Sequence, residues 1–310
     1  MPKVTILGAG NVGATAAHLI LLKGLADVVL LDIVPGIPRG KALDMLESMP
    51  VEGKNVSVKG TDSYADTADS DIVIITAGLP RKPGMSRDEL LEKNAAIMKG
   101  CVEQVKVTSP KAILIIVSNP LDAMVSVASE VSGFPKRRIL GMAGILDTAR
   151  FKTFIAETLE VSVNQIDALV LGGHGDDMVP LISKTTVAGK PIIQCLSPEE
   201  IGRLVQRTRQ GGMEIVNHLK TGSAYYAPAS SVVAMVDAIL RDKKQLLPVA
   251  AYCDKEFGVG GYFIGVPAVI GAAGVEDIIE VSLSEEEQQQ FEKTKEHVRE
   301  LVRKVRSLSR

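Results

Sequence analysis

One histidine, one aspartate and one arginine stand in patterns that suit proton transfer on a small charged substrate. His174 lies in a Gly-Gly-His-Gly-Asp run, where the glycines keep bulk away from the ring. Asp147 and Arg150 are spaced i and i+3 in a helix-like segment, so their side chains share one face. An imidazole with a pKa of about 6.5 beside a carboxylate can take and return a proton near neutral pH. The structural alternatives are a lone structural histidine and a local ion pair on a helix surface.

Two further arginines lie in a Gly/Pro-rich loop that follows a strand-like run. Residues 76–87 read Thr-Ala-Gly-Leu-Pro-Arg-Lys-Pro-Gly-Met-Ser-Arg, which includes Arg81 and Arg87. Planar guanidinium groups bind carboxylates through paired hydrogen bonds, so Arg81 and Arg150 suit the two ends of a small diacid. Arg87 suits stabilisation of negative charge on a reacting carbonyl oxygen, most effectively if the loop closes and excludes water. Solvated surface arginines are the structural alternative for this loop.

A glycine pattern near the N-terminus predicts a dinucleotide site. Gly8, Gly10 and Gly13 form G-x-G-x-x-G between a strand-like and a helix-like run, which lets a pyrophosphate approach the helix N-terminus. Asp32 ends the next strand-like run, at about the 20-residue spacing where a carboxylate reaches the adenosine ribose. A carboxylate there repels a 2′-phosphate, and Ile33 rather than an arginine follows it, so we expect NAD over NADP. A tight structural turn is the alternative.

The elements that must position these residues alternate between strand and helix in the first half. β-branched runs recur, separated by helix-like segments, at residues 4–7, 28–31, 71–76 and 112–118. Their continuous hydrophobicity is typical of strands buried on both faces of a parallel sheet. Between the first two runs, residues 14–23 have helical spacing and end at Gly24, a suitable C-cap. We therefore expect repeated βαβ units.

The second half departs from this alternation, and we expect it to be mixed α+β. Its expected elements are a helix at 145–159, a strand at 168–171, a hairpin at 187–193, a helix at 198–219 and a last helix from 284. The helices at 198 and 284 each begin with S-x-x-E, the capping-box pattern. The apolar stripe of the last helix is Phe291, Val298, Leu301, Val302, Val305 and Leu308. We expect a domain boundary near residues 140–144, which gives domains at 1–143 and 144–310.

Length and composition set the broad class. With 310 residues, 46% hydrophobic and 23% charged, the chain is long enough for two packed globular domains. A formal net charge of −2 leaves no basic excess for nucleic acid, and no apolar stretch approaches the roughly 18 to 20 residues that span a bilayer. The strand-like start leaves no room for a signal peptide, so we expect a cytoplasmic location. Cys101, Cys195 and Cys253 are widely spaced, which favours free thiols over a disulfide or a metal site.

Taken in order, these motifs and the sequence Ser118-Asn119-Pro120 resemble the lactate/malate dehydrogenase family along essentially the whole chain. The resemblance implies an α/β fold: a Rossmann domain with a doubly wound parallel sheet, followed by an α+β substrate domain. It implies His174 as the acid/base, Asp147 as its orienting partner and Arg150 as the ligand of the substrate's C1 carboxylate. Arg87 would polarise the reacting carbonyl from a mobile loop, and Asn119 would bind the same oxygen.

The resemblance also implies which positions line NAD and that the Asn119-Pro120 bond is cis. Those positions are Gly8, Ala9, Gly10, Asn11, Val12, Gly13, Asp32, Asn94, Val117, Ser118 and Asn119. No metal ligand is implied.

Three positions point to the malate branch of the family. Lactate enzymes carry glutamine where Arg81 stands, because a substrate methyl group offers a guanidinium nothing to pair with. They usually have glutamate before the histidine, where this chain has Gly173, and threonine where it has Ala224. We therefore expect NAD-dependent oxidation of (S)-malate to oxaloacetate, with a small molecule as substrate and no nucleic acid or membrane partner.

Alternatives from within and outside the family stay open. Within it, the alternative is oxidation of L-lactate or another 2-hydroxy acid. Outside it, an NAD-dependent glycosidase would need metal ligands that the Cys and His spacing does not offer, and a non-catalytic NAD-binding module would not need the acid/base and arginine set. We expect a homodimer or homotetramer. The candidate interfaces are helix faces at residues 37–49, 145–159 and 219–240, each of which could equally be core.

Overall fold

The first half of the chain forms a parallel sheet in the computed structural model, which describes residues 1–80 and 84–308. Its strands are β1 (Lys3–Leu7), β2 (Asp27–Leu31), β3 (Val58–Thr61), β4 (Ile72–Ile75), β5 (Ile113–Ile116) and β6 (Ile139–Gly141). They lie in the order β3-β2-β1-β4-β5-β6 and all pair in parallel. This is the doubly wound order, and its direction reverses between β1 and β4, where such sheets bind ligands.

Four of these strands confirm the runs predicted from the sequence, whereas β3 and β6 had not been expected. Both are short, and β3 has the sequence Val-Lys-Gly-Thr, whose polar side chains at the sheet edge hide the strand pattern. In β4 the side chains of Ile72 and Ile74 join one hydrophobic cluster and those of Val73 and Ile75 join the other. Burial on both faces explains the continuous apolar run.

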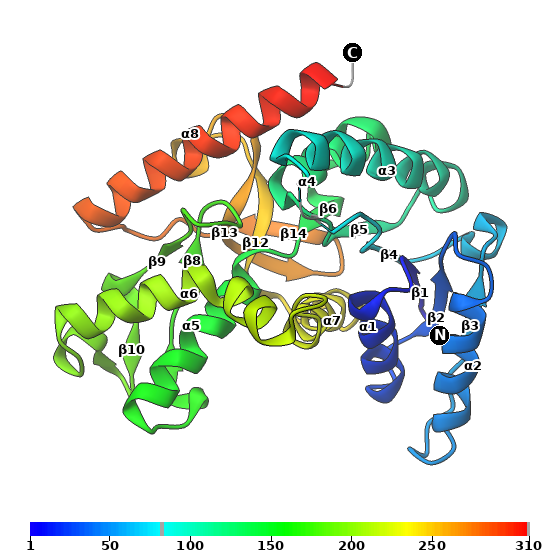
Figure 1. Ribbon diagram of the computed structural model, residues 1–310, viewed down its shortest axis with the longest axis horizontal. Coiled ribbons are helices and arrows are strands. Elements are labelled where there is room, and N and C mark those ends of the chain that lie inside the picture. Colours follow the sequence, from blue (N-terminus) through cyan, green and yellow to red (C-terminus); the bar gives the residue numbers. More distant parts are fainter. Residues whose placement is uncertain (81–83, 309–310) are drawn as a thin grey trace.

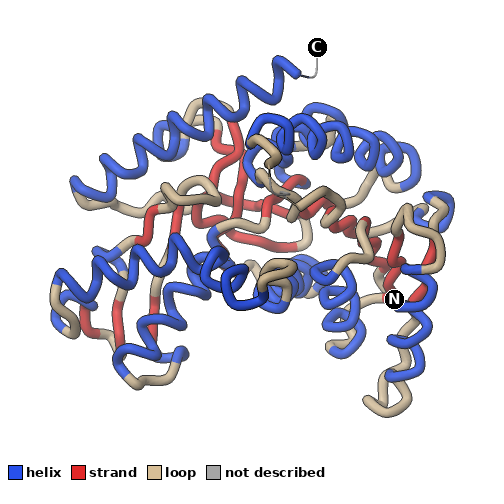
Figure 2. The backbone as a smooth tube through the Cα atoms, in the orientation of Figure 1, coloured by secondary structure: helices blue, strands red, loops and turns tan. Residues whose placement is uncertain are grey.

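Helices cover both faces of this sheet (Figure 2). The first-half helices are α1 (Asn11–Leu22), α2 (Ile37–Ser48), α3 (Arg87–Thr108) and α4 (Leu121–Ser132). Figure 1 shows α3 and α4 on the face opposite α1. Helix α1 begins three residues before the predicted start, because the glycine-rich turn leads straight into it, and it ends as expected before Gly24, at φ +61°.

The second half contains helices and mostly short strands. These are α5 (Gly144–Leu159), β7 (Ile166–Asp167), β8 (Val170–Leu171), β9 (Val179–Pro180), β10 (Thr186–Val187), β11 (Lys190–Pro191), α6 (Pro198–Leu219), α7 (Tyr226–Leu240), β12 (Gln245–Cys253), β13 (Tyr262–Gly271), β14 (Gly274–Ile278) and α8 (Glu285–Leu308). The predicted hairpin is confirmed by the antiparallel pair β10 and β11, which turns at Ala188 and Gly189. The strand predicted at 168–171 is shorter in the structure, because only its last two residues, Val170 and Leu171, pair with another strand.

The longest strands, β12 and β13, were missed by the sequence analysis. They pair antiparallel, with Pro248 opposite Pro267. Proline inside an apolar run argues against a strand interior, because it cannot donate to the ladder. Strand β12 also pairs antiparallel with β6 at Ala250 and Gly141, so β12, β13 and β14 extend the parallel sheet to nine strands.

Capping residues fix where the two long second-half helices begin. In α6 the Ser197 hydroxyl accepts from the Glu200 N–H while the Glu200 side chain accepts from the Ser197 N–H. Ser284 and Glu287 make the same pair of bonds before α8. On α8, the stripe residues Phe291, Val298, Val302 and Val305 are buried. Among the described residues, no helix combines the length and apolarity needed to cross a membrane.

Candidate functional site

A chain of contacts joins His174, Asp147 and Arg150. His174 follows β8, and the other two lie on α5. The Nδ1 of His174 donates to the Oδ2 of Asp147 at 2.8 Å, and the Nη1 of Arg150 donates to its Oδ1 at 3.3 Å. The Asp147 side chain is 2% exposed, against 16% for His174 and 14% for Arg150. The carboxylate is thus buried between two groups that keep access to solvent.

The surroundings of His174 favour its protonated form. Burial alone would lower the pKa of the imidazole, but the charge and hydrogen bond of Asp147 and the charge of Asp122 raise it. Arg150 opposes them. The balance places the pKa of His174 above its ordinary value. An imidazole held in this way can donate a proton near neutral pH and accept one back.

The glycines before His174 allow the chain to fit between β13 and α8. Gly172 exchanges main-chain hydrogen bonds with Gly265 and has φ +90°. The Gly173 N–H donates to the Thr294 hydroxyl at 2.9 Å. A Cβ on Gly172 would lie 2.8 Å from Thr294 Cγ2, so a larger residue would move the histidine. The His174 N–H donates to Asp122 Oδ2 at 3.0 Å.

Arg150 passes over a glycine of α6. A Cβ added to the buried Gly211 would lie 3.0 Å from Arg150 Cδ and 3.4 Å from Nε. At the neighbouring Gly212 it would lie 3.5 Å from Nη2. A glycine inside a helix costs about 1 kcal/mol relative to alanine. Here it leaves room for the guanidinium.

The glycine-rich turn between β1 and α1 is tight on one side and open on the other. A Cβ on Gly13 would lie 1.9 Å from the Gly8 carbonyl oxygen, and one on Gly8 would lie 2.6 Å from Thr76 Oγ1. Nothing lies within 4 Å of a Cβ built on Gly10, and no side chain caps α1. Ala9 is buried in this turn, and Asn11 and Val12 form the first turn of the helix. This open helix N-terminus fits a phosphate group.

Asp32 lies directly after β2, beside the same turn. Its Oδ2 accepts from the Ala9 N–H at 2.7 Å and its Oδ1 accepts from the Val34 N–H at 3.0 Å. Lys41 on α2 donates to the Ala9 carbonyl at 2.7 Å, a contact that no sequence pattern indicated. These bonds fix the carboxylate at the edge of the turn, where the motif predicts the ribose.

The loops after β4 and β5 are tied together by buried polar side chains. Asn94 accepts from the Leu79 N–H at 2.8 Å and donates to the Asn119 carbonyl at 2.7 Å. The Ser118 hydroxyl donates to the Ala77 carbonyl at 2.6 Å. Val117, which precedes it, is also buried. Asn119 is exposed, and the bond to Pro120 is cis, as the family resemblance implied.

Of the two arginines expected on the loop, Arg87 lies among the described residues; there it begins a helix instead, and no contact joins it to the histidine. Arg87 is the first residue of α3, after the N-cap Ser86, and is exposed. No hydrogen bond or ion pair joins it to Asp147 within residues 1–80 and 84–308. Arg81, expected to bind the distal carboxylate, lies outside the described residues.

Sequence reasoning missed Asp122, Thr294 and Gly211, which contact the predicted residues. Asp122 follows the Asn119-Pro120 pair by two positions, and an acid in the first turn of a helix reads as a favourable interaction with the helix dipole. Thr294 lies 121 positions from its partner. Gly211 was one of two adjacent glycines in a helical pattern, and a glycine there signals a close approach.

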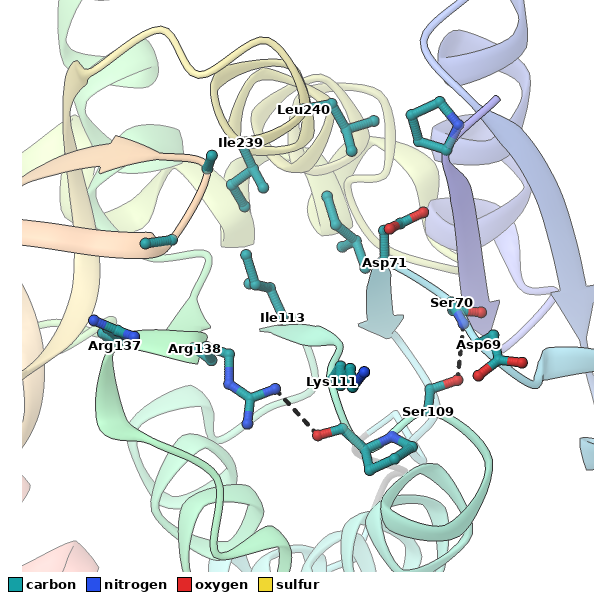
Figure 3. A pocket seen from close by; sticks show the side chains of 15 residues that line it. Asp69, Ser70, Asp71, Ser109, Lys111, Ile113, Arg137, Arg138, Ile239 and Leu240 are labelled. Carbon is teal, nitrogen blue, oxygen red and sulfur yellow. Dashed lines mark hydrogen bonds between the residues drawn. The ribbon is translucent and has the colours of Figure 1, made fainter.

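His174 lines neither of two cavities found among the described residues. The larger, of about 550 Å³, lies at the amino ends of the parallel strands and is lined by residues that precede β1, β4, β5 and β6 (Figure 3). There Arg138 donates to the Pro110 carbonyl at 3.1 Å. The smaller, of about 250 Å³, lies among α5, α6 and α7 and shares Arg150 with the site. Over the parts of the chain that are described, no three His, Cys, Asp or Glu side chains converge as metal ligands would.

Comparisons with known proteins find one family along the chain. The model of the lactate/malate dehydrogenase NAD binding domain matches residues 2–141, and that of the lactate/malate dehydrogenase alpha/beta C-terminal domain matches residues 145–308. A malate dehydrogenase of Rhodopirellula baltica is 56% identical over 302 residues, which are 97% of this chain and 96% of that protein. One of Heliobacterium modesticaldum is 56% identical over 97% of each chain.

Solved structures with the same fold include enzymes of both kinds. The apo malate dehydrogenase of Picrophilus torridus matches with a TM-score of 0.97 and 44% identity, over 99% of this chain and 98% of that one. The lactate dehydrogenase of Cryptosporidium parvum, solved with lactic acid and nicotinamide adenine dinucleotide, matches with a TM-score of 0.95 and 43% identity over 98% of each chain. The fold alone therefore does not separate the two activities.

Proposed function

Because the chain belongs to the lactate/malate dehydrogenase family, we propose that it catalyses the reversible, NAD-dependent oxidation of (S)-malate to oxaloacetate. The observation that carries the chemistry is the contact chain from His174 through Asp147 to Arg150. The choice of malate is supported by relatives at 56% identity that are malate dehydrogenases. Arg81 supports it too, since malate has a second carboxylate for a guanidinium to bind and lactate does not.

The glycine-rich turn fits NAD. The open space at Gly10 and the uncapped start of α1 suit the pyrophosphate, and the acid at Asp32 suits the ribose hydroxyls while opposing a 2′-phosphate. When bound, NAD accepts the hydride that leaves C2 of the substrate. Asn94 and Ser118, named as cofactor positions, have side chains bonded to neighbouring loops. Their proposed part is to hold the Asn119 turn against that space.

His174 is the proposed acid/base. Through Nε2, the imidazole takes the proton of the C2 hydroxyl during oxidation and returns it to the carbonyl oxygen during reduction. Asp147 holds the ring by Nδ1, which fixes the tautomer and stabilises the imidazolium. Arg150 binds the C1 carboxylate, so the Asp147 carboxylate links the proton-transfer group to the substrate-binding group.

Three further residues complete the proposed substrate site. Arg81 binds the distal carboxylate. Arg87 and Asn119 act on the reacting oxygen, where a cation and an amide N–H stabilise the charge that develops as hydride arrives. Arg87 is exposed at the end of the loop that contains Arg81. A closing movement that carried Arg87, at the start of α3, to the substrate would also exclude water.

We propose that copies of the chain associate as a homodimer or homotetramer in the cytoplasm. Helix α2, one of the faces suggested from the sequence, leaves Ile37, Leu43 and Leu46 exposed at 45%, 57% and 42%. Apolar side chains of this size gain by burial against a partner. The three cysteines are free, which suits a reducing compartment. Light scattering coupled to size-exclusion chromatography tests the association.

Steady-state kinetics with oxaloacetate and pyruvate, each with NADH and NADPH, test the proposal. We expect oxaloacetate with NADH to be the preferred pair, and kcat/KM with NADH to exceed that with NADPH at least about tenfold, a discrimination of about 1.4 kcal/mol. A preference for pyruvate would favour lactate oxidation instead. If no substrate oxidised NADH, the chain would be a non-catalytic NAD-binding module.

A further inference from the structure

Asp122 is a buried carboxylate that touches the main chain of the proposed acid/base. It lies in the first turn of α4, two positions after the cis Asn119-Pro120 bond. Its side chain reaches across to the segment after β8, where Oδ2 accepts the N–H of His174 at 3.0 Å. Only 4% of the residue is exposed. Asp122 therefore joins two segments, each of which carries a residue of the proposed site.

The ionised side chain of Asp122 is energetically unfavourable at this buried position. Its other oxygen, Oδ1, is buried without a hydrogen-bond partner among the described residues. The pKa of Asp122 is raised to about 6: burial and the charge of Asp177 raise it, and the N–H and charge of His174 oppose them. A buried, half-satisfied ionised group destabilises the fold. Such groups persist mainly where they have a function.

The segment that Asp122 holds has little freedom to move elsewhere. A Cβ on Gly173 would lie 2.8 Å from Val298 Cγ2 and 3.3 Å from Asp122 Oδ2. Thr294 on the same helix accepts the Gly173 N–H. The main chain before His174 is therefore fixed by α8, and the main chain at His174 is fixed by Asp122 from α4. The side chain is fixed separately, by Asp147.

We propose that Asp122 is a positioning residue that locks the main chain of His174 to the Asn119 turn and supplies a second negative charge favouring the imidazolium. This inference rests on the proposed function. Among the described residues, the charges that bear on His174 are those of Asp147 and Arg150 on α5 and of Asp122 on α4. The charge of Asp177, whose carboxylate is paired with His297 of α8 at 3.0 Å, bears on Asp122. Of these, Asp122 alone contacts the His174 main chain.

Two substitutions of Asp122 separate its hydrogen bond to the His174 main chain from its negative charge. Asp122→Asn keeps an oxygen that accepts the His174 N–H but removes the charge. Asp122→Ala removes both. Asp177→Asn is the matched control, since it removes a nearby carboxylate that does not bond to His174. The primary measurement is the titration of His174 by NMR of ¹³C-labelled histidine. The protein has four histidines, and His174→Asn assigns the signal.

We expect Asp122→Asn to lower the titration midpoint of His174 by about half a pH unit or more, because an opposite charge in contact favours the protonated form. The fall in oxaloacetate reduction with rising pH should move down by the same amount. Asp177→Asn should leave both in place. Asp122→Ala should also lower kcat about tenfold or more, through misplacement of the ring. If Asp122→Ala does not fold, Asp122→Asn decides the question.

Thermal stability provides a second test, because Asp122→Asn should raise Tm although it lowers the titration midpoint of His174. The folded-state pKa of Asp122, about 6, lies above its ordinary 3.8, so the ionised side chain destabilises the fold increasingly as pH rises through that range. Asp122→Asn should therefore raise Tm at pH 8 and lose this gain below pH 4. A purely structural acid predicts the reverse.

Two results would overturn the inference: an unchanged His174 midpoint in Asp122→Asn, or an equal shift in Asp177→Asn. Failure of the proposed function is a different result, the absence of oxaloacetate turnover in the unmodified chain. The NMR titration does not depend on turnover, so it decides the role of Asp122 in either case.

Discussion

Asp147 holds His174 by Nδ1 at 2.8 Å, and this leaves Nε2 as the only ring nitrogen free to exchange a proton with substrate. An ionised carboxylate can only accept, so the neutral imidazole carries its proton on Nδ1. In the proposed mechanism the neutral ring is therefore the base for oxidation and, once protonated, the acid for reduction. The same carboxylate accepts a hydrogen bond from Arg150, so it links the direction of the ring to the guanidinium that we propose binds the substrate's C1 carboxylate.

The pH dependence of the two directions should be opposite. Because the pKa of His174 is raised above its ordinary value of about 6.5, the imidazolium persists to a higher pH than in a free histidine side chain. Oxaloacetate reduction uses imidazolium, so kcat/KM should fall as pH rises through this pKa. Malate oxidation uses neutral imidazole, so its kcat/KM should rise over the same range. Two profiles that move in the same direction would exclude His174 as the titrating group.

Replacing His174 by asparagine should abolish most proton transfer without harming cofactor binding. The amide cannot act as a general base, so kcat should fall by roughly 10² to 10⁴. NADH affinity, measured by fluorescence, should stay near that of the unmodified chain, because the glycine-rich turn is a separate part of the structure. Largely intact turnover would remove His174 from the mechanism.

Arg81 should decide between substrates that differ by one carboxylate. A charge-assisted pair with the distal carboxylate contributes roughly 1.5 to 3 kcal/mol, and Arg81→Gln should lose it for oxaloacetate. The same change should hold or raise the rate with pyruvate, so the oxaloacetate-to-pyruvate preference should fall by at least roughly 10². The measurement is kcat/KM for both substrates. An unchanged ratio would mean that Arg81 does not contact substrate.

Gly211→Ala should stabilise the fold but weaken the binding of oxaloacetate. Alanine favours the helix by about 1 kcal/mol, but its Cβ would lie 3.0 Å from Arg150 Cδ and push the guanidinium aside. We expect KM for oxaloacetate to rise about threefold to tenfold, since displacement of a substrate-binding group by tenths of an ångström weakens binding. Gly202→Ala on the same helix is the control, because nothing lies within 4 Å of its Cβ. Gly202→Ala should be more stable than the unmodified chain and have the same KM for oxaloacetate. Equal KM values in both variants would separate Gly211 from substrate binding.

What the sequence predicts well here are residues whose role follows from a local pattern. Gly8 and Asp32 directly follow the buried strands β1 and β2, and Gly13 lies in the first turn of α1, so the ends of two neighbouring strands bring the motif to one edge of the sheet. The contact between Asp147 and His174 was available only through the family resemblance, because the residues are 27 positions apart and no periodicity relates them. Asp122 gave a signal that a helix start explains equally well. The pairing of β12 with β13 was hidden by Pro248 and Pro267, and pairing between distant segments is decided by packing rather than by local preference.

The antiparallel pairing of β12 with β6 makes one continuous sheet from both halves of the chain. At the junction, a Cβ on Gly141 would lie 2.7 Å from Val125 Cγ2 and 2.9 Å from Ala250 Cβ, so the two strands meet through a close-packed glycine. The two halves are therefore not hinged bodies that can close on a ligand as a clamp does. Denaturant should therefore unfold both halves in a single cooperative transition, in which neither half survives as a folded intermediate.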